Sequence, residues 1–119
     1  RRAHATAGRR IELLRPLAEM LHTVNKSPFE RTSLQSCLRV AADGSSVLLI
    51  EDGVYAAMSD TESANLVAQA TKRLSIYALG PDLKARGIDE TRLAAGIQLV
   101  DYGGFVDLAA EHDTVQAWL

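Results

Sequence analysis

The stretch Ser46–Asp52 constrains the fold of this chain more than any other part of it. Its letters, SVLLIED, form a near-continuous apolar run that is rich in branched residues. A strand with one face in water alternates apolar and polar residues, whereas a strand covered on both faces of a parallel sheet is apolar almost throughout. The run therefore predicts a central strand of a parallel sheet.

Three further runs have the same character and are separated by helical stretches: Leu21–Val24, Leu74–Leu79 and Ile97–Tyr102. Strands that alternate with helices predict a parallel sheet joined by right-handed crossovers. We expect one small α/β domain with a doubly wound parallel sheet of four to five strands and helices on both faces. The apolar tail Thr114–Leu119 is expected to pack against another surface.

Capping patterns predict where the helices begin. The capping box Ser27–Glu30 would open the first helix at once, and Thr32 or Ser33 offers a competing start for a shorter helix. A second box at Ser59–Glu62 predicts a helix that continues to about Arg73. Two further helices are expected over Leu83–Arg86 and Phe105–His112.

Charge divides the chain into two parts. Residues 1–20 hold five Arg and two Glu, whereas residues 21–119 hold eight basic and thirteen acidic residues. We expect residues 1–20 to be a basic extension that is disordered or not native, and residues 20–119 to form the domain. An acidic body without a basic stripe lacks the charge that phosphate backbones require, which argues against direct nucleic-acid binding.

Neither a disulfide nor a membrane span is expected. The chain has one cysteine, which cannot form an intramolecular disulfide, and no apolar run approaches the roughly 18 residues that cross a bilayer. These features predict a cytoplasmic protein.

Several common sites are disfavoured by the sequence. The three histidines, His4, His22 and His112, are far apart and have no paired ligand spacing, so no metal site is predicted. The turn after the first strand lacks the glycines of a dinucleotide site, and Gly103-Gly104 is more simply a tight turn than an anion cradle. Asp52 and Asp101 superficially resemble the carboxylates of a phospho-acceptor domain, but the acidic pair that would hold Mg²⁺ is missing.

Cys37 is the candidate site residue. Leu34, Cys37, Leu38 and Ala41 stand at i, i+3, i+4 and i+7, which places the sulfur on or beside the buried stripe of a helix and favours a core role. A reactive role is the alternative. If Ser33 capped the helix, Cys37 would lie in the second turn, where the helix dipole and a neighbouring arginine would favour the thiolate modestly.

Five segments together resemble the DsrH/TusB family of sulfur-relay subunits, in order and with natural spacing over Met20–Trp118. They are MLHTVNKSP at 20–28, LLIEDGVYAA at 48–57, IYALGPDLKARG at 76–87, VDYGGFVDL at 100–108 and TVQAW at 114–118. The resemblance implies a DsrE-like fold with flavodoxin-like layering. It also implies assembly with DsrE/TusD-like and DsrF/TusC-like subunits into a dimer of heterotrimers that moves persulfide sulfur without a cofactor.

The resemblance implies that the family has two branches, which deliver sulfur to different pathways. In sulfur oxidation, sulfur passes between a TusA-like donor and a DsrC/TusE-like acceptor, and in the other branch it passes toward 2-thiouridine at the tRNA wobble position. DsrH members are similar to this chain in carrying a cysteine in the first helix and a TVQAW-like tail, which favours the oxidative branch. In both branches the main acceptor cysteine belongs to the DsrE/TusD-like subunit.

Two roles for this chain follow from the resemblance. In the first, Cys37 is an auxiliary sulfur carrier, whose thiolate attacks the terminal sulfur of a donor persulfide and passes that sulfur to another thiolate. In the second, the chain is a non-catalytic subunit, with Trp118 and Val115 as interface anchors or with the tail folded over its own core.

Overall fold

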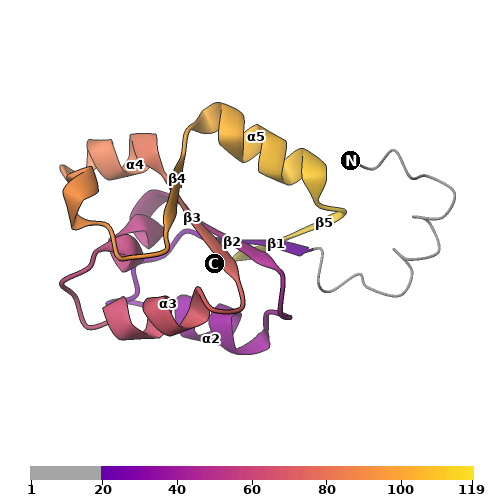
Figure 1. Ribbon diagram of the computed structural model, residues 1–119, viewed down its shortest axis with the longest axis horizontal. Helices are drawn as coiled ribbons and strands as arrows, with labels where there is room; N and C mark the ends of the chain where they lie inside the picture. The colour runs from indigo at the N-terminus through magenta and orange to yellow at the C-terminus, as the bar shows by residue number, and fades with distance from the viewer. Residues whose placement is uncertain (1–19) are drawn as a thin grey trace, which may run out of the picture.

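A computed structural model of the protein describes residues 20–119, and its centre is one sheet of parallel strands (Figure 1). The strands are β1 (Met20–Val24), β2 (Ser46–Leu49), β3 (Ser75–Leu79), β4 (Gln98–Val100) and β5 (Thr114–Trp118). Their order across the sheet is β4-β3-β2-β1-β5, and each neighbouring pair is parallel. The predicted doubly wound α/β fold is confirmed.

The apolar tail is the fifth strand of this sheet. It pairs with β1 from Met20↔Thr114 to Val24↔Trp118. The apolar letters of the tail predict only that it packs against another surface, and they do not indicate a strand. Four of its five residues are exposed, because β5 is an edge strand whose outer side has no partner strand within residues 20–119.

Helices lie on both faces of the sheet (Figure 1). They are the α-helices α2 (Ser33–Val40), α3 (Ala64–Ala70), α4 (Gly80–Ala85) and α5 (Tyr102–Glu111), with the 3-10 helices η2 (Glu51–Ala57) and η3 (Glu90–Arg92). Helices α2 and α3 cover one face, and α5 crosses the opposite face between the two edge strands. No helix within residues 20–119 is both long and apolar enough to cross a membrane.

Strand alternation divides the core between these two layers. On the α2 and α3 side, Val24, Val47 and Ile76 pack with Cys37 and Val67 in the larger cluster. On the α5 side, a smaller cluster joins Leu21 and Leu48 of the strands to Leu108 of the helix. Adjacent residues of β2, Val47 and Leu48, therefore belong to different core clusters, as the two-residue repeat of a strand requires.

The predicted strand Ser46–Asp52 is too long, because β2 ends at Leu49 and the chain then turns into η2. Glu51 has a φ of 50°, which leaves extended geometry, and its backbone N–H donates to Asp82 Oδ2 at 2.6 Å. Gly53 then passes so close to β1 that an added Cβ would lie 2.0 Å from the Val24 carbonyl oxygen. The close approach of Gly53 to the β1 backbone therefore accompanies the end of β2 at Leu49, before the predicted end at Asp52.

The first helix begins at the later of the two predicted starts. Ser27 does accept hydrogen bonds from nearby backbone N–H groups, including that of Phe29 to its Oγ at 3.2 Å, but these close a single turn. Helix α2 begins at Ser33, without a side-chain cap at Thr32. Helix α3 begins at Ala64, later than the box at Ser59–Glu62 predicts, and ends at Ala70.

Smaller differences concern other boundaries. Helix α4 follows β3 directly at Gly80, whereas the sequence predicted a turn there and a helix only from Leu83. Strand β4 is shorter at both ends than the predicted Ile97–Tyr102. The domain boundary predicted near residue 20 concerns residues 1–19, which lie outside the described part of the chain.

Candidate functional site

Cys37 lies on the inner side of α2, in the core between this helix and the sheet. The buried stripe predicted from spacing is confirmed, because Leu34, Cys37, Leu38 and Ala41 are all buried. Cys37 itself is 0% exposed and belongs to the same cluster as Val24 and Val47. The sulfur is thus surrounded by apolar side chains.

This environment disfavours the thiolate. Burial raises the pKa of the Cys37 thiol to about 12, and the positive charge of Arg73 opposes the rise only in part. A pKa near 12 leaves roughly one thiol in a hundred thousand ionised at pH 7. The described structure therefore presents Cys37 as a protonated core residue, while its predicted role as a sulfur carrier stays a prediction.

Arg73 is the basic residue whose charge acts on Cys37, and no pattern in the sequence singles it out. Its guanidinium donates hydrogen bonds to the carbonyl oxygens of Leu38 and Ala41, the latter at 2.7 Å, and pairs with Asp43 at 3.2 Å. Arg73 thus caps the carboxyl end of α2. Arg73 lies just after α3 and 36 positions after Cys37 in the sequence. No local sequence pattern therefore predicts its contact with the end of α2.

Arg39 does not approach the sulfur in this way. It is exposed in the last turn of α2 and has no ion pair within residues 20–119. Ser33, the predicted cap, is the first residue of the helix, and its hydroxyl donates to the Leu119 carbonyl oxygen at 3.0 Å. This bond ties the start of α2 to the end of the chain.

His22 and Trp118 form a second buried polar contact on this side of the sheet. Trp118 Nε1 donates to His22 Nδ1 at 3.1 Å, and Trp118 packs against the larger core cluster. His22 is 4% exposed, its Nε2 has no hydrogen-bond partner within residues 20–119, and burial lowers its pKa. Trp118 therefore packs over its own core, whereas Val115 is 49% exposed.

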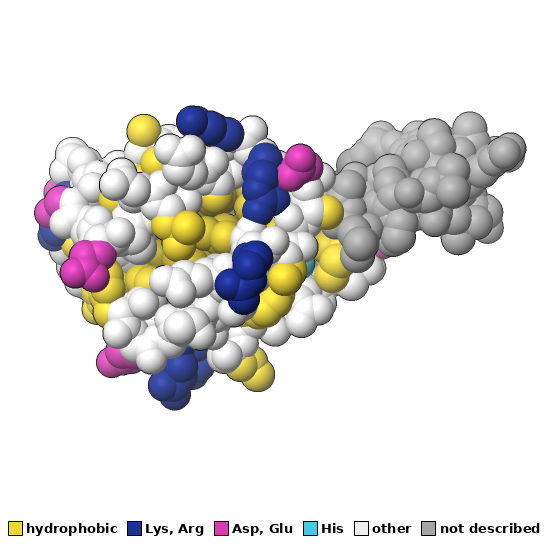
Figure 2. Space-filling view, turned by 90° about the horizontal axis from the view of Figure 1, so that it is seen from below, with side chains coloured by type: hydrophobic (Ala, Val, Ile, Leu, Met, Phe, Trp, Pro, Cys, Tyr) yellow, Lys and Arg dark blue, Asp and Glu magenta, His cyan; other side chains and the backbone are white. Residues whose placement is uncertain are grey.

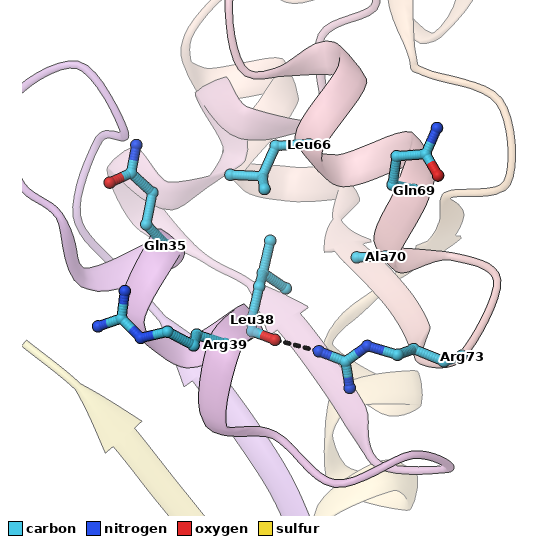
Figure 3. Close-up of a pocket in the computed structure, with 7 residues that line it drawn as sticks. All are labelled: Gln35, Leu38, Arg39, Leu66, Gln69, Ala70 and Arg73. Atoms are coloured by element: carbon cyan, nitrogen blue, oxygen red, sulfur yellow. Dashed lines mark hydrogen bonds between the residues drawn. The ribbon is translucent and has the colours of Figure 1, made fainter.

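An open groove with a volume of about 470 Å³ lies between α2 and α3, and we call it the α2–α3 groove (Figure 3). Its lining residues are Gln35, Leu38, Arg39, Leu66, Gln69, Ala70 and Arg73. Leu38 and Leu66 point toward each other between the two glutamines. Figure 2 shows hydrophobic side chains gathered on this face with Lys and Arg side chains beside them.

In doubly wound α/β folds, ligands bind beyond the carboxyl ends of the strands. A cavity of about 500 Å³ lies there, between Ser27, Asp52 and Tyr55. Asp52 pairs with Arg86 at 2.9 Å, so it has a structural partner.

The helix start at Gly103-Gly104 is closed by its own cap. Asp101 Oδ1 accepts a hydrogen bond from the Gly104 N–H at 2.8 Å, which uses one of the donors that an anion would need. Within residues 20–119, no three His, Cys, Asp or Glu side chains are grouped as metal ligands. His4 lies outside the described residues.

Comparison with known proteins decides the family. The model of the family described as "DsrH like protein" matches residues 26–115. This chain belongs to the DsrH-like family. Protein TusB of Pectobacterium parmentieri is 37% identical over 100 residues, and protein TusB of Escherichia coli K12 is 36% identical over 99 residues. Each match covers 83% of this chain and 100% of the relative.

Solved structures show the same fold for this DsrH-like chain. The ychN protein from E. coli superposes with a TM-score of 0.75 at 17% identity, over 83% of this chain and 97% of that one. A protein of unknown function from Methanobacterium thermoautotrophicum superposes with a TM-score of 0.65 at 21% identity, over 82% and 96%. At these identities the likeness concerns the fold alone.

Proposed function

We propose that this chain is a structural, non-catalytic subunit of a cytoplasmic sulfur-relay complex, in which thiols of its partners carry the persulfide. Membership in the DsrH-like family supports a role as a subunit of such a complex. The observation that carries the structural role is the burial of Cys37, whose thiol is 0% exposed and has a pKa raised to about 12. Transfer between thiols needs an accessible thiolate, and this sulfur meets neither condition in the described structure.

The partners in this proposal are DsrE/TusD-like and DsrF/TusC-like subunits, arranged as a dimer of heterotrimers. A TusA-like donor and a DsrC/TusE-like acceptor exchange sulfur with the complex through the DsrE/TusD-like subunit. In this proposal the chain provides binding surface for the other subunits and takes no part in the transfer of sulfur between thiols. The open groove on α2 and α3 and the exposed outer side of β5 are available for such contacts.

Two pathways are candidates for the complex that contains this chain. Oxidative sulfur metabolism is predicted from the cysteine in the first helix and from the tail. Thiolation of the tRNA wobble uridine is supported by relatives that are named TusB and match over their whole length. The tail is a strand of the sheet and therefore serves the fold whichever pathway applies.

The carrier role of Cys37 makes a different prediction from the structural role. It requires α2 to move away from the sheet, so that the thiol meets another protein's persulfide. A complex rebuilt from wild-type partners and either wild-type or Cys37→Ala chain separates the two roles, with Ser36→Ala as the neighbouring control on the same helix. We expect both variants to transfer labelled sulfur from donor to acceptor at the wild-type rate.

Loss of transfer in Cys37→Ala alone, with the complex still assembled, would establish the carrier role instead. Assembly is checked by size-exclusion chromatography before each assay. An Ala at this site removes the sulfur and leaves only a small cavity. A transfer defect in an intact complex would therefore report the missing thiol.

A further inference from the structure

The α2–α3 groove continues along both helices beyond the part described above. A second open stretch, with a volume of about 330 Å³, adjoins the first, because Gln35 and Leu66 line both. The other residues that line this second stretch are Pro28, Phe29, Leu34, Glu62 and Ser63. We call the two stretches together the extended groove.

Helices α2 and α3 run in the same direction along the extended groove. At their carboxyl ends, Arg73 donates a hydrogen bond to the Ala41 carbonyl oxygen at 2.7 Å. At their amino ends, Leu34 of α2 and Ser63, which precedes α3, line the same stretch. Helix α2 has eight residues and is therefore about 12 Å long, so the groove has the length of about two helical turns.

The extended groove is apolar in its middle and open to solvent. Leu66 is 38% exposed and points toward Leu38 (Figure 3), and Phe29 is 53% exposed at the amino end. Exposed aromatic and aliphatic side chains that line one concave surface are typical of a protein-binding site. An amphipathic helix fits this surface, because its apolar side chains recur on one side every three to four residues.

The walls of the groove also favour a helix over an extended segment. An extended peptide binds by adding a strand to the edge of a sheet, where free backbone N–H and C=O groups are available. The extended groove lies between two helices, and the edges of the sheet are β4 and β5. Helical walls use their backbone groups internally and offer side chains to a partner.

The charged residues that line the extended groove are separated by sign. Arg39 and Arg73 line the carboxyl end, and Glu62 lines the amino end. Arg73 is paired with Asp43, whereas Arg39 and Glu62 are exposed and have no ion pair within residues 20–119. One end of the groove therefore favours a negative charge, and the other end favours a positive charge.

A helix that lies antiparallel to α2 and α3 matches both ends. Its first turn would lie beside Arg39, and its last turn would lie beside Glu62. The helix dipole favours acidic residues in a first turn and basic residues in a last turn, so both ends would meet opposite charges. A helix in the parallel direction would bring its basic end to the arginines and its acidic end to Glu62.

We propose that the extended groove binds an amphipathic helix of one partner subunit in the antiparallel direction. Apolar residues of that helix lie over Leu38 and Leu66, an acidic residue of its first turn lies beside Arg39, and a basic residue of its last turn lies beside Glu62. This inference rests on the proposed function, which supplies the partner subunits. It adds the kind of element that the groove binds and the direction in which that element lies.

Affinity of the full chain for the purified partner subunits tests the use of the groove. Leu66→Asp places a charge in its apolar middle and should weaken binding by about tenfold or more. Leu99→Asp is the matched control, because Leu99 is 37% exposed on β4, outside the extended groove, and should bind as the wild type does. Circular dichroism checks that both variants fold. Wild-type affinity of Leu66→Asp, or an equal loss in both variants, overturns the proposal.

Charge reversal tests the two ends of the groove. Arg39→Glu and Glu62→Lys should each weaken binding by about tenfold, because each brings a like charge to one end of the bound helix. Lys84→Glu is the control, since Lys84 is exposed on α4 and lines neither stretch of the groove. Unchanged affinity of both Arg39→Glu and Glu62→Lys overturns the antiparallel arrangement.

Photo-crosslinking in the assembled complex identifies the bound helix and its direction. A benzophenone side chain replaces Gln35, which lines both stretches, or Gln69, which lines only the stretch at the carboxyl end. Position 69 should crosslink nearer the first turn of one partner helix than position 35 does. An acidic residue of that turn, changed to Lys, should restore the binding of Arg39→Glu. Crosslinks in the reverse order, or crosslinks to a strand or a loop, overturn the proposal.

Sulfur transfer by the same complex separates this inference from the proposed function. If the wild-type complex assembles and transfers sulfur while the groove variants bind normally, the groove proposal alone fails. If the wild-type chain does not bind the partner subunits at all, the proposed function fails and this inference fails with it.

Discussion

The thiol of Cys37 lies among aliphatic side chains that suppress its ionisation. Its pKa is raised from an ordinary value near 9.0 to about 12, because burial removes the water that would stabilise the thiolate. Alkylation proceeds through the thiolate, so the folded chain should react about a thousandfold more slowly with iodoacetamide at pH 8 than the urea-unfolded chain. The rate is measured by mass spectrometry at timed intervals.

Comparable alkylation rates in the folded and unfolded chain would show that the thiol is accessible. The unfolded chain supplies the control, because it holds the same cysteine without the fold. Leu34→Ala is the matched variant, since it opens a cavity in the same buried stripe and should speed alkylation of the folded chain.

His22 should make stability depend on pH. Burial lowers its pKa in the folded chain below the ordinary 6.5, so the unfolded chain binds a proton first as the pH falls. The contribution of neutral His22 to the free energy of unfolding is therefore fully present above about pH 7. It decreases as the pH falls below about 6.5, and the decrease ends once the pH is below the pKa of His22 in the folded chain. Once Nδ1 of His22 is protonated, it can no longer accept the hydrogen bond from the Trp118 indole N–H.

Urea unfolding between pH 7.5 and pH 5.5 measures this loss. The lowered pKa values of Asp60 and Asp89 affect stability only at lower pH, and comparison with His22→Gln separates the contribution of His22 from that of the other histidines. In His22→Gln the loss between the two pH values should be smaller than in the wild type. An equal loss in both proteins would contradict the account.

At the scale of elements, Arg73 joins α3 to the end of α2. Arg73→Ala removes hydrogen bonds to the carbonyl oxygens of Leu38 and Ala41 and leaves these groups without partners. We expect the free energy of unfolding to fall by about 1–3 kcal/mol. Arg92→Ala is the control, because it removes only an exposed pair with Asp60 and should change the urea midpoint little.

A second prediction at this scale concerns Gly53 in η2. In Gly53→Ala the new methyl group would lie 2.0 Å from the Val24 carbonyl oxygen, so β1 and η2 must separate. The loss should be about 2 kcal/mol or more. In Gly103→Ala the nearest heavy atom is Asp101 Oδ1 at 3.4 Å, and a urea midpoint near that of the wild type is expected. Equal effects of the two changes would contradict the close approach.

Element types could be predicted from the sequence better than element ends. The run around Val47–Leu49 predicts a buried parallel strand because both faces are covered, and the structure confirms it. The early end of β2 depends on contacts of Glu51 and Gly53 with distant segments, which no local pattern carries. Strand β5 was missed because the polar residues Thr114 and Gln116 interrupt its apolar residues, and its pairing with β1 rather than an apolar run makes it a strand.

At the scale of the whole molecule, the candidate site combines local and distant contributions. The burial of Cys37 could be predicted from the spacing of its neighbours, since that spacing already defines the inner side of α2. The positions of Arg73, His22 and the groove residues could not, because the fold brings these residues together from separate elements. Folding thus places the thiol on the inner side of α2 and the groove residues Gln35 and Arg39 on its exposed side.

The location of persulfide in an assembled complex tests the structural role most directly. The complex is loaded from a persulfide donor, trapped with iodoacetamide while folded, and digested with trypsin, which releases Thr32–Arg39 with the sequence TSLQSCLR. We predict that this peptide carries no extra sulfur, while the DsrE/TusD-like partner gains about 32 Da. An added 32 Da on Cys37 that passes on to the acceptor would contradict the account.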